Sequence, residues 1–188
     1  MKDPEPLVRR WVMRAYRTAV RALYDDSELA DVLARLPDDA RVETWEAPVL
    51  HSQWVPERYI IAWSFAVWEG PARRTRAKYE RFSQRWMDDG FGRLRRAILN
   101  LASPRILIER APVMWREDHT HGALEYELEG ERSATLRLHD SPYCEVPQSR
   151  AAMAECFRYS ISLARANDVT ETHALEAPGV LRVRLSWT

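Results

Sequence analysis

The chain has 188 residues, enough for one domain or for one domain preceded by a helical segment. Hydrophobic residues make up 46% and charged residues 30%, so the composition supports a packed core and excludes a disordered chain. The 28 basic and 28 acidic residues cancel, which gives no overall attraction to nucleic acid or to an anionic membrane.

The first 40 residues are predicted to form a helical preface to the main domain. Apolar residues at three- and four-residue spacing predict a helix that starts after Asp3-Pro4 and has an arginine-rich opposite face. We interpret that face as solvated, with a nucleic-acid or partner contact as the alternative. Asp25-Asp26-Ser27 is predicted to cap a short second helix, which Pro37 breaks. The stretch 41–53 is predicted to be irregular or weakly extended.

Further helices are predicted at 57–68, 72–88 and 103–115, with an amphipathic helical segment over 94–101 between the last two. The first is apolar nearly all round, which predicts burial on several sides. The second carries an aromatic stripe and is predicted to end or hinge at Gly90-Phe91-Gly92. The third is expected to be disturbed at Pro112, because proline cannot donate a helical hydrogen bond.

After His121-Gly122 the apolar period changes from three or four residues to two. This change predicts a hairpin over 124–138, a helix over 151–166, and two last strands over 169–175 and 180–187. The predicted fold class is α+β, with a helical N-terminal half packed on a four-stranded antiparallel sheet. The order in the C-terminal half is ββαββ.

Cys144 and Cys156 are the two cysteines, and neither belongs to a paired-cysteine motif. The first residues lack the apolar core of a signal peptide, and no stretch approaches the roughly 20 apolar residues of a membrane span. We therefore expect a cytoplasmic protein with free thiols and no membrane insertion. A bridge between the two cysteines is the alternative.

Several short motifs carry a family resemblance that covers about residues 50–187. They are Trp54-Val55-Pro56-Glu57-Arg58-Tyr59, Leu101-Ala102-Ser103-Pro104-Arg105, Met114-Trp115-Arg116, the hairpin at Gly122, the helix after Pro147 and the closing Leu185-Ser186-Trp187. On these motifs the chain resembles the 4-vinyl reductase-like domains and their myxobacterial paralogues. Those domains share a fold with haem-nitric-oxide-binding domains and with vesicle-tethering (TRAPP) subunits.

The resemblance implies a frequently dimeric domain that holds a small apolar ligand or a protein partner and serves as a sensory input. This sequence departs from that family in two places. Many relatives carry cysteines around the last hairpin that are able to bind metal, whereas 172–181 has no cysteine. Haem-binding relatives need a helical histidine and a Tyr-x-Ser-x-Arg clamp. Helices from 56 to 117 contain no histidine, and 158–162 lacks the clamp spacing, so no cofactor is predicted.

The candidate chemistry is sparse. His119, His121 and Cys144 are types that ligate transition metals, but a His-x-His in a polar loop is more often solvated, so no metal is predicted. No nucleophile elbow, phosphate loop or dinucleotide fingerprint occurs in the sequence, which favours a non-enzymatic protein.

Two residue sets remain as candidates for binding. An aromatic set is predicted to line a ligand pocket, with plain core as the alternative: Tyr59, Trp63, Phe82, Trp86 and Trp115. Basic residues at a helix N-terminus oppose its dipole and are predicted to face a partner: Arg73, Arg74 and Arg76. The sequence thus predicts a dimeric regulatory domain for a small apolar ligand or a protein partner. The alternatives are a scaffolding subunit and an enzyme with an unrecognised cofactor.

Overall fold

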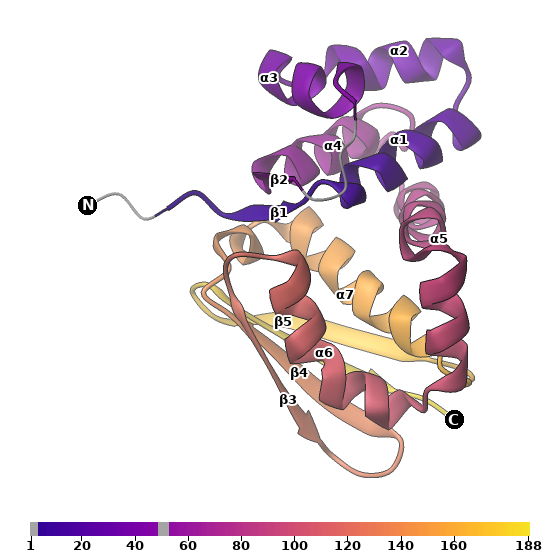
Figure 1. Ribbon diagram of the computed structural model, residues 1–188, viewed down its shortest axis with the longest axis vertical. Coiled ribbons are helices and arrows are strands. Elements are labelled where there is room, and N and C mark those ends of the chain that lie inside the picture. The colour runs from indigo at the N-terminus through magenta and orange to yellow at the C-terminus, as the bar shows by residue number, and fades with distance from the viewer. Residues whose placement is uncertain (1–3, 49–52) are drawn as a thin grey trace. The chain divides into compact units, whose positions relative to one another are not determined.

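The computed structural model describes residues 4–48 and 53–188, and their side chains except those of Trp11 and residues 91–98. The chain divides into two compact units, Met1–Gly90 and Phe91–Thr188, here called the helical unit and the sheet unit. The predicted α+β class and the four-stranded antiparallel sheet are both confirmed. Figure 1 shows the elements of each unit.

The helical unit contains a short two-stranded ribbon and a set of helices. Its elements are β1 (Leu7–Arg9), α1 (Trp11–Leu23), α2 (Asp26–Ala34), α3 (Asp38–Arg41), the π-helical turn η1 (Val42–Glu46), β2 (Trp54–Pro56), α4 (Arg58–Glu69) and the first part of α5 (Arg76–Leu101).

The start of the chain corrects the predicted first helix. Residues Leu7–Arg9 form β1, which pairs antiparallel with β2 through Val8 and Val55, both buried. Helix α1 therefore begins only at Trp11. The predicted irregular stretch 41–53 is also wrong in its first part, because η1 is helical there. The Thr44 hydroxyl fixes this turn, since it donates to the Ala40 carbonyl and accepts from Trp63 Nε1 at 2.8 Å.

The predicted cap of the second helix is confirmed. The Asp25 side chain accepts from the backbone N–H groups of Ser27 and Glu28, and Glu28 completes a capping box by accepting from the Asp25 N–H. Ser103 caps α6 in the same manner, accepting from Ile106 N–H at 3.3 Å, with Pro104 at the first helical position.

Helix α5 is longer than predicted, because it runs through Gly90-Phe91-Gly92 without a break. Each glycine costs a helix only about 1 kcal/mol relative to alanine, which a helix of 26 residues tolerates. Helix α6 likewise continues through Pro112, so the expected disturbance does not end it. None of the described helices is long and apolar enough to cross a membrane.

The sheet unit contains the sheet, two helices that pack on it, and a short 3-10 turn. Its elements are α6 (Pro104–Asp118), β3 (Ala123–Leu128), β4 (Ser133–His139), η2 (Pro142–Glu145), α7 (Pro147–Ser162), β5 (Thr170–Ala177) and β6 (Val180–Ser186), besides the end of α5. Two hairpins joined by α7 meet through their inner strands, which gives the sheet order β3-β4-β6-β5.

The sheet has one buried and one solvated face, as the alternating pattern predicts. Leu181, Val183 and Leu185 of β6 are fully buried, whereas Arg182 and Arg184 between them are exposed. Helix α6 packs on β3, and α7 packs on β5 and β6 (Figure 1). On the solvated face, Arg137 pairs with Glu127 at 3.0 Å and with Glu176 at 3.1 Å.

Candidate functional site

The helical unit has an aromatic cluster whose centre is Tyr16 of α1. The Tyr16 ring stacks on Trp86 at 5.0 Å between centroids, and it meets Phe82 edge-on at 5.4 Å and Trp63 at 6.4 Å. These separations are typical of favourable aromatic pairs. We call these four residues the Tyr16 cluster. It brings together three of the five residues that the sequence predicts for a pocket, and it places a fourth ring between them.

Sequence reasoning missed Tyr16, although a signal for it is present. Val12, Tyr16, Ala19 and Val20 follow one another at helical spacing, and all are buried. Tyr16 itself is 1% exposed. Arg14, Arg17 and Arg21 of α1 mark the polar side of this helix. Because Tyr16 follows the apolar stripe instead, it is expected to face the core.

Hydroxyl groups gather at one edge of the Tyr16 cluster. The Tyr16 and Ser64 hydroxyl oxygens lie 3.3 Å apart. The Tyr79 hydroxyl lies beside Ser64 and Ser83 without full hydrogen-bond geometry to either, and burial raises the pKa of Tyr79 to about 12. The Ser83 hydroxyl and Trp86 Nε1 are buried without a hydrogen-bond partner among the described residues. This edge can therefore offer polar groups to a small uncharged molecule or a water.

Tyr59, the fourth pocket candidate in this unit, has its polar contacts elsewhere. Its hydroxyl donates to Asp39 at 3.3 Å, and the Arg58 guanidinium lies 4.6 Å from its ring centroid. Arg58 also pairs with Asp39 and Glu5, each at 2.6 Å. The hydrogen bond from Arg58 lowers the pKa of Asp39. Tyr59 is thus part of an ion-pair network near the surface.

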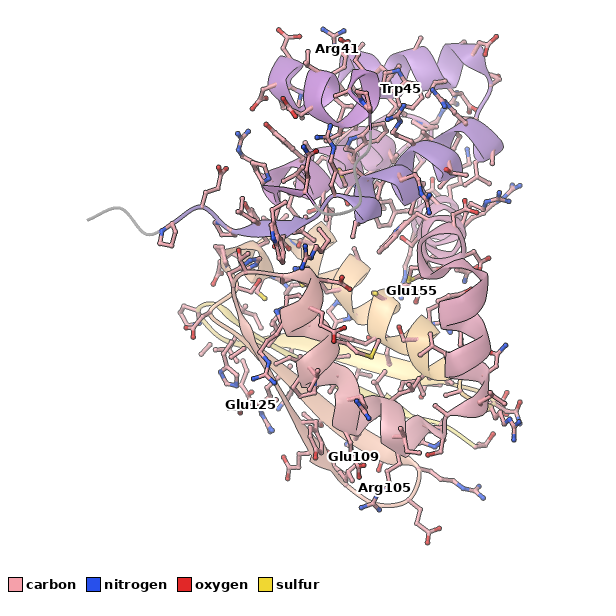
Figure 2. All side chains as sticks on the ribbon, viewed as in Figure 1. Arg41, Trp45, Arg105, Glu109, Glu125 and Glu155 are labelled. Atoms are coloured by element: carbon pink, nitrogen blue, oxygen red, sulfur yellow. The ribbon has the colours of Figure 1, made fainter. Side chains whose placement is uncertain are left out.

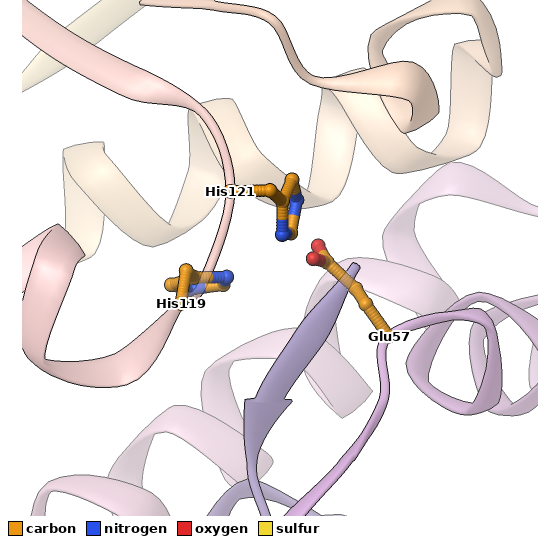
Figure 3. Close-up of side chains that lie close together, drawn as sticks. All are labelled: Glu57, His119 and His121. Atoms are coloured by element: carbon orange, nitrogen blue, oxygen red, sulfur yellow. The ribbon is translucent and has the colours of Figure 1, made fainter. Parts of the chain in front are cut away.

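Trp115, the fifth pocket candidate, belongs to the sheet unit and contacts two histidines. The His119 ring stacks on the Trp115 indole at 3.7 Å between centroids and is nearly parallel to it. Trp115 Nε1 donates to the His121 carbonyl at 2.9 Å, which closes the turn between α6 and β3. Figure 3 shows both imidazoles on that segment. Their ring centroids are 5.8 Å apart, and His121 meets Tyr143 edge-on.

Cys144 does not join these histidines as a metal site. It is fully buried in η2, and its carbonyl accepts a hydrogen bond from Arg150 at 2.8 Å. Among the described residues, no group of potential metal ligands within 4.8 Å of one another combines His119, His121 and Cys144. Both cysteines are free thiols.

The predicted interaction arginines lie at the start of α5 and are exposed. Arg74 pairs with Glu69 at 2.7 Å, and Arg76 pairs with Glu80 at 2.7 Å. Arg73 and Arg74 both adopt positive φ angles, 49° and 57°, in the turn before the helix. Local carboxylates therefore offset the basic charge of Arg74 and Arg76, which reduces the conflict with the helix dipole.

The chain was compared with known families and structures. No family model and no curated protein matches it. It is similar to an H-NOX protein from S. oneidensis in the Fe(II)NO state, with 10% identity, a TM-score of 0.66, and 96% of this chain and 99% of that one covered.

Two more solved structures agree with that similarity. An Fe(II) unliganded H-NOX protein from K. algicida has 7% identity, a TM-score of 0.64 and 96% of both chains covered. An oxygen-binding H-NOX domain related to soluble guanylate cyclases has 9% identity and a TM-score of 0.63, with 94% of this chain and 93% of that one covered. At these identities the likeness shows the fold alone. The haem-nitric-oxide-binding fold that the resemblance implies is thus confirmed.

The histidines of this chain decide whether it offers an axial ligand to haem. Histidine is a common axial ligand of haem iron. The described helices contain no histidine between their first and last residues. His119 is the C-cap of α6, and His121 follows it in the turn. His139 lies beside Glu125 at 3.2 Å and His173 beside Glu171 at 2.9 Å, both in the sheet. The described residues do not fit a haem held by a helical histidine.

Proposed function

We propose that this chain is a non-enzymatic sensory domain that binds a small, mainly apolar ligand without haem. The observation that carries the proposal is an H-NOX fold over 94–96% of the chain whose described helices lack a histidine. The similar H-NOX structures hold iron in Fe(II) or Fe(II)NO states or bind oxygen. This chain has the fold but lacks a histidine in its described helices. That combination supports a likeness in function to the 4-vinyl reductase-like domains more than to the haem-binding domains.

The Tyr16 cluster supports an apolar ligand in the helical unit. Six of the eight tryptophans of the chain lie in residues 1–90, and Trp63 and Phe82 are fully buried. Aromatic walls with a few polar groups at one edge are typical of sites for small uncharged ligands. In this proposal a ligand contacts Trp63, Phe82 and Trp86 when the Tyr16 ring turns aside, and the hydroxyl groups beside Tyr79 orient it.

Two measurements test the proposal. The purified chain is titrated with haemin, and we expect no stoichiometric Soret band. The chain is then screened with small aromatic and aliphatic molecules by tryptophan fluorescence and native mass spectrometry, and a saturable one-to-one ligand is expected. Trp86→Leu should weaken the binding of that ligand, whereas Trp187→Leu in the sheet unit should leave its binding unchanged. Stoichiometric haem that survives gel filtration, or the absence of any saturable ligand, would contradict the proposal.

A second candidate function, a docking or scaffolding subunit, is favoured by one surface. Ile106 and Val113 lie seven residues apart on α6 and are 49% and 40% exposed, so they share one face of the helix. The ion pair Arg105–Glu109 at 2.9 Å flanks that face. Self-association through this face is expected to disappear in Ile106→Asp. Sedimentation equilibrium measures it, with Arg182→Gln on the solvated face of the sheet as the control. A monomeric wild-type chain would exclude self-association.

A further inference from the structure

Two arginines of α1 converge on one indole at the surface of the helical unit. Arg17 and Arg21 are four residues apart, so they lie on the same face of the helix. The Arg21 guanidinium carbon is 4.4 Å from the centroid of the Trp45 ring, and that of Arg17 is 5.6 Å away. Figure 2 labels Trp45, which belongs to η1. Both distances are within the range of cation–π attraction.

Neither arginine has a carboxylate partner among the described residues. The Arg17 guanidinium donates to the Ala47 carbonyl at 3.1 Å, which leaves most of its five N–H donors for other acceptors. The two carboxylates of η1 are engaged elsewhere. Glu43 pairs with Arg10 at 3.7 Å, and Glu46 pairs with Arg41 at 2.9 Å. Within the described part of the helical unit, no carboxylate thus compensates the positive charge of Arg17 and Arg21.

The arrangement holds like charges close together, which is unfavourable unless an anion joins them. Burial lowers the pKa of Arg17, and the neighbouring charges of Arg21 and Arg10 lower it further. The Ala47 carbonyl and the Trp45 ring fix the positions of the guanidinium groups, so little side-chain freedom remains to be lost on binding. Two planar guanidinium groups match the oxygens of a phosphate better than they match any uncharged group.

We propose that Arg17, Arg21 and the Trp45 indole form a binding site for a phosphate-bearing small molecule. The two guanidinium groups donate to the phosphate oxygens, and the indole holds both arginines in place. The Trp45 ring lies 6.0 Å from the ring of Trp63, so this site adjoins the Tyr16 cluster. The proposal rests on Arg17 and Arg21 and does not depend on the proposed sensory function. The site is distinct from the arginines at the start of α5, of which Arg74 and Arg76 have carboxylate partners.

The test uses the full chain at low ionic strength, with pyrophosphate and adenosine monophosphate as probes and inorganic phosphate as the minimal ligand. Tryptophan fluorescence and isothermal titration calorimetry measure binding, and sodium chloride of equal ionic strength is the blank. We expect saturable one-to-one binding and a rise in Tm. Arg17→Gln and Arg21→Gln should each weaken binding by roughly tenfold or more, because each removes charged hydrogen bonds.

Arg105→Gln is the matched control, because Arg105 is an exposed helical arginine of the sheet unit that pairs with Glu109. It should bind as the wild type does, and Trp45→Phe should bind with intermediate strength. Circular dichroism verifies that each variant folds. Binding that Arg17→Gln and Arg105→Gln weaken equally, or binding that does not saturate, would show general ionic attraction and overturn the proposal. Binding of adenosine monophosphate but not of inorganic phosphate or pyrophosphate would overturn the assignment to the phosphate group.

Discussion

Replacement of Tyr16 by alanine should lower the free energy of unfolding of the helical unit more than replacement of any surface residue. Tyr16 is 1% exposed, and its ring contacts Trp63, Phe82 and Trp86. Truncation of a buried aromatic side chain to alanine costs about 3–5 kcal/mol through lost transfer energy and a residual cavity. Tyr16→Phe keeps the ring and removes only the hydroxyl near Ser64, which costs about 1 kcal/mol.

Urea denaturation followed by tryptophan fluorescence measures both changes, because the cluster contains two tryptophans. Tyr126→Ala is the matched control, since Tyr126 is 43% exposed on β3. In Tyr16→Ala, phenol has the shape of the missing group, because alanine keeps the Cβ, and it should restore part of the lost Tm. A loss below about 1 kcal/mol, or one equal to that of Tyr126→Ala, would refute the placement of Tyr16 at the centre of the cluster.

Three further changes test the local structure. Gly70→Ala should cost about 1–3 kcal/mol, because its Cβ would lie 2.7 Å from the Ala66 carbonyl and 2.8 Å from Asp31. Thermal denaturation measures the change, and an unchanged Tm would contradict this close packing. The raised pKa of Tyr79, about 12 against an ordinary value near 10, means that its contribution to stability is complete below pH ~10 and lost as the pH rises towards 12. Tyr79→Phe should therefore lose less stability than wild type between those values in denaturation titrations, and equal losses would argue against a buried hydroxyl. Hydrogen bonds from Glu28 N–H and Ser27 lower the pKa of Asp25, so its stabilisation of α2 is present above pH ~4 and fades as the pH falls. Asp25→Ala should flatten the acid limb of the stability curve relative to Asp26→Ala, and an unchanged limb would contradict the cap.

The predictions that succeeded rest on strong local signals. The alternation of Leu181, Val183 and Leu185 with exposed arginines fixed the orientation of β6. The Asp25 cap and the Ser103-Pro104 start predicted two helix boundaries to within one residue. In these segments the residue pattern has few structural interpretations. Asp25 and Ser103 fit a helix cap, and the alternating residues of β6 fit a strand with one buried face.

The predictions that failed concern contacts between residues distant in sequence. Strand β1 has three residues, too few for a period, and exists because Val8 pairs with Val55 some 47 positions later. The helical turn at Thr44 is supported by a hydrogen bond from Trp63, which lies 19 residues later in the chain. The Tyr16 cluster unites α1, α4 and α5, whose relative placement no local pattern contains. The convergence of Arg17 and Arg21 on Trp45 was invisible for the same reason.

Helix α5 has a practical consequence for anyone who wishes to study the two units apart. The boundary between Gly90 and Phe91 falls inside this helix, so the chain has no linker at which it can be divided there. A cut at that peptide bond would remove the i to i+4 hydrogen bonds that span it and leave two frayed ends, each with exposed amide or carbonyl groups. Fragments should therefore keep all of Arg76–Leu101, and a protease that nicks this region would report helix opening instead of linker exposure.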